Sequence, residues 1–271
     1  EQGDFGGDRA ASNGWRPSRS TNITRNVAGL VATPRGRHAW SASPTRATTA
    51  EHRRQPPSRA GVCIRPHFET AAGFFSAGAG LVLRVPGTPG PVLLGCQHIF
   101  GPAGGLPAPI AADALPGFVR SVALLDAFTG APLTGTSQWL PIPGADAENP
   151  GRDLYAVALP EVHNCYEHWM RRDPAALGEE VMISSPHHAD GPNEHRAVVT
   201  RVAGPVLILQ FEDADLYPRG WSGAPVVDRR ARLIGMLTRG GSGRGIALKT
   251  RVLRYHVRQA FDARDRAAGE E

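Results

Sequence analysis

Three side chains in this sequence have the types and the order needed for nucleophilic acyl transfer. Ser222 lies in the stretch Gly-Trp-Ser-Gly-Ala-Pro at residues 220–225, His98 follows an apolar run, and Asp153 precedes another. A serine hydroxyl becomes a nucleophile when a histidine accepts its proton, and a buried carboxylate then orients that histidine. Because a lone Gly-x-Ser-Gly is usually an ordinary turn, the positions of a base and an acid decide between the two interpretations.

Chain order excludes two of the three common arrangements of such a triad. The order serine–acid–histidine leaves 49 residues after Ser222, with one histidine, His256, and Ala224 stands where a Gly-x-Ser-x-Gly elbow has its second glycine. The order acid–histidine–serine needs an aspartate before His98, and the only two there lie within the first eight residues. The order histidine–aspartate–serine remains.

Eight aspartates between His98 and Ser222 are candidates for the orienting acid. This acid should lie beside a rigid apolar strand, away from bulk water. Asp153 fits best because it opens the apolar run 154–159, and Asp126, at the end of the run 122–125, is second. The eight are Asp113, Asp126, Asp146, Asp153, Asp173, Asp190, Asp213 and Asp215.

The elements that must position these residues are predicted to be short strands. Residues 81–85 and 92–96 predict a hairpin around the Pro/Gly cluster at 86–90, and similar runs follow near 119–125, 154–159, 178–186, 197–202, 206–211, 226–228, 233–238 and 246–248. Thr250 is a candidate N-cap for a helix that runs to about Ala263. One side of this helix carries Val252, Leu253, Val257 and Phe261. Many short strands with one late helix indicate an all-β barrel or sandwich.

Composition narrows the possible partners. Residues 1–58 are rich in Arg, Ser and Pro and predict a flexible tail, which carries much of the net charge of +5. The remainder has no basic stripe and no apolar run of eighteen residues, so neither a nucleic-acid nor a membrane partner is expected. Three widely spaced cysteines, Cys63, Cys96 and Cys165, form no disulfide framework. The lack of a visible apolar leader and of a disulfide framework favours a cytoplasmic location. Because the sequence begins without Met, it is also compatible with a leader that has been removed.

Three segments together resemble the chymotrypsin-like (trypsin-fold) serine peptidases, in the bacterial style without a zymogen apparatus. Residues 94–98, Leu-Gly-Cys-Gln-His, resemble the catalytic-histidine motif of that family. Residues 152–159, Arg-Asp-Leu-Tyr-Ala-Val-Ala-Leu, resemble its aspartate motif, and residues 220–227 resemble its Gly-x-Ser-Gly-Gly-Pro nucleophile motif. The gaps of 55 and 69 residues suit a compact member, and the match covers about residues 70–262.

The resemblance implies two six-stranded antiparallel Greek-key barrels with a C-terminal helix. A first barrel over residues 59–165 would supply His98 and Asp153, and a second over 166–271 would supply Ser222. The activity implied is that of a serine endopeptidase acting on polypeptides through an acyl-enzyme, without a cofactor or metal. The N–H groups of Gly220 and Ser222 would form the oxyanion hole. The substrate-binding residues implied are Leu216, Leu237, Thr238, Arg239 and Gly240.

Three positions depart from the family pattern. Ala224 replaces a glycine, and Trp221 replaces the acidic or amide residue before the serine, so that no activation ion pair with a new N-terminus can form. Leu216, six residues before Ser222, occupies the usual floor of the primary pocket and favours an apolar or small substrate side chain. Asp213 and Asp215 lie close enough to change this preference if the loop shifts.

Other functions are compatible with parts of the sequence. A catalytically silent barrel that binds peptides is the main alternative, although all three triad candidates are present. A metal site could involve His163, Cys165, His168, His187, His188 and His195, but their spacing matches no closed zinc pattern. A nucleic-acid module would depend on the Arg-rich tail alone, and additional domains or partner proteins are also compatible with the chain.

Overall fold

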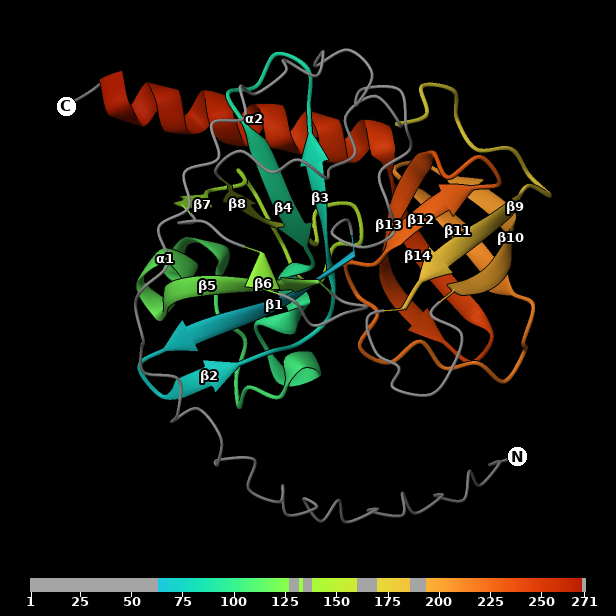
Figure 1. Cartoon of the computed structure of the whole chain (residues 1–271), viewed down its shortest axis with the longest axis horizontal. Helices are drawn as coiled ribbons and strands as arrows, with labels where there is room; N and C mark the ends of the chain where they lie inside the picture. The colour runs from blue at the N-terminus through green and yellow to red at the C-terminus, as the bar shows by residue number, and fades with distance from the viewer. Residues whose placement is uncertain (1–62, 127–131, 134–137, 160–169, 186–193, 270–271) are drawn as a thin grey trace, which may run out of the picture. The chain divides into compact units, whose positions relative to one another are not determined.

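The computed structural model describes residues 63–126, 132–133, 138–159, 170–185 and 194–269 (Figure 1). These residues form two antiparallel β units and a C-terminal helix, which confirms the all-β class predicted from the sequence. The predicted tail, residues 1–58, and the predicted boundaries at residues 58 and 165 lie outside the described residues.

The first unit is an eight-stranded antiparallel sheet that forms a half-barrel, and three of its strands, β2, β6 and β7, have only two or three residues. The strand order is β6-β5-β1-β3-β4-β8-β7, and β2 pairs with β1. The bounds are β1 (Cys63–Thr70), β2 (Gly73–Phe75), β3 (Gly80–Arg84), β4 (Pro91–Gly95), β5 (Val119–Asp126), β6 (Pro132–Leu133), β7 (Gln138–Leu140) and β8 (Tyr155–Ala158). Between β4 and β5 lie the short helices η1 (Gln97–Ile99), η2 (Pro102–Gly104), η3 (Ala112–Ala114) and α1 (Leu115–Phe118).

The hairpin of β3 and β4 was predicted, whereas the long strand β1 was not. Leu81 pairs with Leu94 and Leu83 with Val92, on either side of the Pro/Gly turn. All five residues of β4 are buried, because β3 and β8 pair along its edges and apolar side chains cover its faces. The end of this strand therefore provides a rigid support for the residues that follow it.

The second unit is a closed six-stranded barrel, seen in Figure 1 in yellow to orange-red. Its order is β10-β11-β14-β13-β12-β9. The bounds are β9 (Glu180–Ser184), β10 (Glu194–Ala203), β11 (Val206–Phe211), β12 (Pro225–Asp228), β13 (Leu233–Gly241) and β14 (Arg244–Lys249). Residues along β11 alternate between half-buried and buried, as expected for a strand with one face toward the barrel interior.

The predicted C-terminal helix is α2 (Thr250–Gly269), which is longer than the sequence indicated. Its buried side includes Leu253, Val257 and Phe261, as predicted, and also His256 and Ala260. Thr250 does not act as the predicted N-cap: it lies inside the first turn, and its hydroxyl donates to the Leu233 carbonyl at 3.1 Å. This bond attaches the start of the helix to β13.

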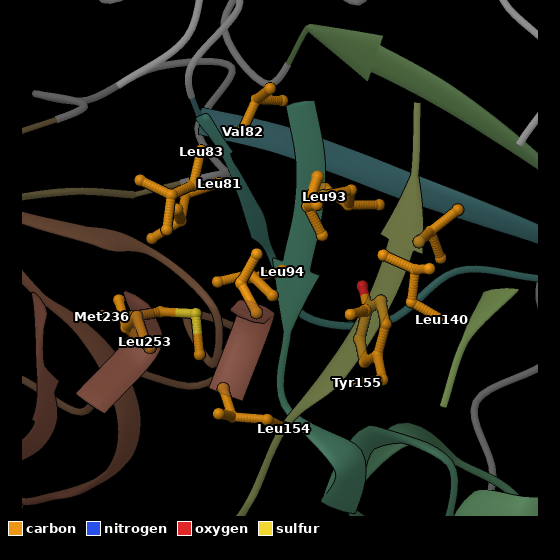
Figure 2. Close-up of a cluster of buried hydrophobic side chains, with 14 of the residues drawn as sticks. Leu81, Val82, Leu83, Leu93, Leu94, Leu140, Leu154, Tyr155, Met236 and Leu253 are labelled. Carbon is orange, nitrogen blue, oxygen red and sulfur yellow. The ribbon is translucent and has the colours of Figure 1, made fainter. Parts of the chain in front are cut away.

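One apolar cluster includes residues from both β units and from the helix. Leu94 and Leu154 of the half-barrel belong to the same buried cluster as Met236 of β13 and Leu253 of α2, and Figure 2 shows these side chains close together. Since Leu154 directly follows Asp153, and Leu94 precedes His98 by four residues, this shared core supports the segments that carry the candidate site.

Candidate active site

The structure brings Ser222, His98 and Asp153 into one hydrogen-bonded chain. His98 Nδ1 lies 2.5 Å from Asp153 Oδ2, and His98 Nε2 lies 2.8 Å from Ser222 Oγ. The second carboxylate oxygen, Oδ1, accepts the backbone N–H of His98 at 2.9 Å. Asp153 therefore contacts both the backbone and the ring of His98, which fixes the direction in which the imidazole points.

Burial differs along this chain in a way that suits proton transfer. The Asp153 side chain is fully buried and the His98 side chain is 18% exposed. Ser222 is half-buried. A buried carboxylate with two N–H donors remains an acceptor, while the histidine and serine at the open end stay accessible to a substrate.

Each of the three residues lies just outside a strand. His98 is in η1, three residues after β4, and Asp153 precedes β8, which pairs with β4 so that Gly95 faces Tyr155. This pairing explains how two residues 55 positions apart meet. Ser222 lies in the loop before β12. In this loop the N–H of Gly223 donates to the carbonyl of Leu237 in β13 at 2.7 Å.

The loop around Ser222 is held by backbone contacts with the first unit. Ala79 donates its N–H to the Ser222 carbonyl at 2.7 Å. A Cβ on Gly223, whose φ is +98°, would lie 1.9 Å from the Ala79 carbonyl oxygen. Glycine is therefore required at this position both for its backbone conformation and for the close approach. The sequence showed residues 72–80 only as a Gly-rich run and did not indicate this role.

Trp221 packs into the second barrel. It is 3% exposed, its ring centroid lies 4.2 Å from that of His195, and Phe211 contacts it edge-on at 6.0 Å. An aromatic side chain thus anchors the loop at the position where the family pattern has an acidic or amide residue. His195, one of the six residues of the alternative metal site, is part of this packing; the other five lie outside the described residues.

Gly220 and Ser222 carry the two backbone N–H groups that were expected to form the oxyanion hole. Gly220 has a φ of +77°. In the part of the chain that the structure describes, the N–H groups of Trp221 and Ala224 donate to backbone carbonyls, and those of Gly220 and Ser222 do not.

The residues expected to bind substrate lie along β13 and in the loop before Ser222. Leu237 and Thr238 are buried, and the Thr238 hydroxyl donates to the Ile246 carbonyl at 3.1 Å. β12 pairs with β13 only as far as Met236, so among the described residues only β14 pairs with the stretch that includes Arg239 and Gly240. One edge of this stretch therefore pairs with no other strand of the described chain.

Leu216, in the loop before Ser222, is half-buried and packs against the core of the closed barrel. Its carbonyl accepts the N–H of Gly243 at 2.8 Å. The loop is thus joined to the turn between β13 and β14.

Cys96 is a buried thiol beside the triad that the sequence did not connect with it. The sulfur, His98 and Asp153 have potential ligand atoms within 4.8 Å of one another. Burial raises the pKa of the Cys96 thiol well above its usual range, and the charge of Asp153 raises it further. The S–H donates to the Leu237 carbonyl at 3.6 Å, and the carboxylate is already bonded to His98. A metal ion there would have to displace both bonds, so His98 and Asp153 suit proton transfer better than metal binding.

Comparisons with known proteins bear on the fold. No family model and no curated protein matches the chain. The solved structure of a serine endoprotease from Yersinia pestis is similar at a TM-score of 0.52 and 15% identity, over 79% of this chain and 67% of that one. The chain has a serine-protease fold. The Rv3671c protease from M. tuberculosis in its active form also matches, at 15% identity and a TM-score of 0.48, over 85% of this chain and 94% of that one.

The serine-protease fold agrees with the resemblance seen in the sequence. In this chain the two β units have the same division of site residues that the resemblance implies, with His98 and Asp153 on the half-barrel and Ser222 on the closed barrel. Among the described helices, none is long and apolar enough to cross a bilayer.

Proposed function

We propose that the protein is a serine endopeptidase that hydrolyses peptide bonds of a polypeptide substrate through an acyl-enzyme. The observation that carries this proposal is the hydrogen-bonded chain from Asp153 through His98 to Ser222, with distances of 2.5 and 2.8 Å. The fold, which is shared with a serine endoprotease, supports it. No cofactor is needed for this chemistry.

In the first step, His98 Nε2 takes the proton of Ser222 Oγ as the oxygen attacks the substrate carbonyl. Asp153 holds the Nδ1–H and stabilises the imidazolium that forms. The N–H groups of Gly220 and Ser222 bind the developing oxyanion. In comparable sites each such donor lowers the activation free energy by about 3–4 kcal/mol. His98 then protonates the leaving amine, and a water molecule releases the acyl group by the same route.

Labelling with a fluorophosphonate probe tests this proposal, because the probe reacts only with an activated serine. Wild type is expected to label, whereas Ser222→Ala and His98→Ala are expected to lose labelling. Ser242→Ala is a matched control: Ser242 also lies between two glycines, but in the exposed turn after β13. Labelling of Ser222→Ala, or none of folded wild type, would contradict the proposal, and the second result would favour the silent peptide-binding module.

The same geometry leads to a proposal for the substrate side chain. With the carbonyl oxygen at Gly220 and Ser222, the residue before the cleaved bond points between the loop 216–220 and β13. A Cβ on Gly240 would lie 2.2 Å from Pro218 Cγ, so these two walls are in van der Waals contact. Leu216 is half-buried against the barrel core nearby. Little width remains for a large side chain.

We therefore expect small residues to be preferred before the cleaved bond. Substrates with Ala at this position should have kcat/KM at least about tenfold higher than matched substrates with Phe or Arg, since a misfit of a few methylene groups costs this much or more. A peptide panel that varies only this residue measures the preference. In Pro218→Ala, the kcat/KM values of the substrates with Ala and with Phe before the cleaved bond should be closer to each other than in wild type. If substrates with Phe or Arg at this position are cleaved fastest, the expectation is wrong, and the loop 216–220 must move away from β13 when substrate binds.

A further inference from the structure

Arg239 of β13 lies next to the buried carboxylate of Asp153. Its Nε lies 4.0 Å from Asp153 Oδ2, and its side chain is 35% exposed. Its Nη2 donates to the Ala147 carbonyl and lies 4.0 Å from Glu148 Oε2. One guanidinium therefore links the substrate-facing strand, the loop before Asp153 and the carboxylate itself.

Arg239 places a positive charge beside the buried carboxylate of Asp153. A fully buried carboxylate is costly unless it is paired and hydrogen-bonded. Among the described residues, Arg239 is the only arginine or lysine within 4.0 Å of Asp153. Thr238, the neighbour of Arg239, gives its hydroxyl to Ile246 and not to the carboxylate.

The other groups that face the pair of His98 and Asp153 do not supply this charge. Burial raises the pKa of the Cys96 thiol and of the Tyr155 hydroxyl well above their usual ranges, so both are neutral near pH 7. Arg152 is adjacent in sequence, but its guanidinium lies beside Gly144. Glu148 is an anion on the far side of Arg239 and is 92% exposed.

We propose that Arg239 is a positioning residue of the triad, which acts through Asp153. Its guanidinium holds the carboxylate in the orientation that faces His98, and it attaches the loop at 147–148 to β13. This inference depends on the proposed function, because the triad must operate for its positioning to matter. Because the guanidinium carries a positive charge beside the pair of His98 and Asp153, its removal should change the pH dependence of the site, which a merely structural role would not do.

The test is the pH dependence of the labelling rate with a small fluorophosphonate that carries no peptide. In Arg239→Gln, the midpoint of the acidic limb should move to higher pH by about half a unit or more, because a cation near the carboxylate has been removed. Arg244→Gln is the matched control, since it removes the same charge from an exposed position on β14. Arg239→Lys keeps a positive charge and should restore much of the wild-type midpoint.

A second readout does not depend on activity. In the Ser222→Ala background, the His98 ring can be titrated by NMR, with and without Arg239→Gln, and the same upward shift is expected. If Arg239→Gln does not melt cooperatively, Arg239→Met, which keeps the apolar stem, takes its place.

Two results would overturn the inference. One is an unchanged midpoint in the neutral variants, even if KM for peptides changes, because that pattern belongs to a substrate contact. The other is an equal shift in Arg244→Gln, which would show a general charge effect. Absence of labelling in wild type is a separate result and counts against the peptidase proposal itself.

Discussion

At the scale of single residues, Asp153 makes two contacts that no other aspartate of the described chain makes: its two oxygens accept the ring and the backbone N–H of His98. Replacing the carboxylate by an amide keeps the shape but offers an NH₂ group or a neutral oxygen. In Asp153→Asn the imidazole is expected to adopt the tautomer whose Nε2 carries the proton. That nitrogen can no longer accept the proton of Ser222.

We expect Asp153→Asn to lower the fluorophosphonate labelling rate by about 10⁴-fold, the size of effect seen when the tautomer is wrong in such a triad. Asp126→Asn is the control, because Asp126 was the second candidate from the sequence and ends β5. Labelling kinetics at fixed pH, with thermal melting to check folding, measure both variants. A loss in Asp126→Asn that equals the loss in Asp153→Asn would contradict the assignment of the acid.

At the scale of elements, α2 contacts the loop that carries Asp153. His256 is 7% exposed, and its Nε2 lies 3.2 Å from the Gly151 carbonyl, to which it donates. Burial lowers the pKa of His256 below its usual 6.5, and the nearby Arg152 lowers it further, while the bond to Gly151 partly opposes the shift. Burial, followed by the charge of Arg65, lowers the pKa of His67 in the same direction.

A folded-state pKa below the unfolded one means that the unfolded chain binds more protons as the pH falls. The free energy of unfolding should therefore decrease as the pH falls below about 6.5, by at most about 1.4 kcal/mol per pH unit for each such histidine. His256→Gln should reduce this slope, and the double variant with His67→Gln should reduce it further. Urea unfolding at pH 5, 6 and 7 measures the slopes. If His256→Gln has the wild-type slope, the helix contact does not contribute to the pH dependence.

At the scale of the whole molecule, much of the fold follows from local patterns. The β3–β4 hairpin, the short strands of the closed barrel and the amphipathic side of α2 were all predicted, because alternation, Pro/Gly turns and a helical apolar stripe are visible within a few residues. The order of His98, Asp153 and Ser222 also predicted which residues the structure brings together.

Contacts between distant segments could not be predicted in the same way. Arg239 and Asp153 are 86 residues apart in the sequence, and their approach depends on how the two β units pack. Strand β1 was missed because Pro66 and charged residues interrupt its apolar pattern, although its buried residues alternate regularly toward the end. The packing of Trp221 on His195 likewise needs β10 and the loop before β12 to be side by side.

The apolar cluster shared by Leu94, Leu154, Met236 and Leu253 has a consequence for the order in which the candidate site is assembled during synthesis. The half-barrel, with His98 and Asp153, leaves the ribosome first, and Ser222 follows with β12. The side chains of β13 and α2 that complete the support under both segments are made last. The nascent chain thus carries His98 and Asp153 before Ser222, and the apolar cluster that supports these segments is complete only when Leu253 of α2 has been added.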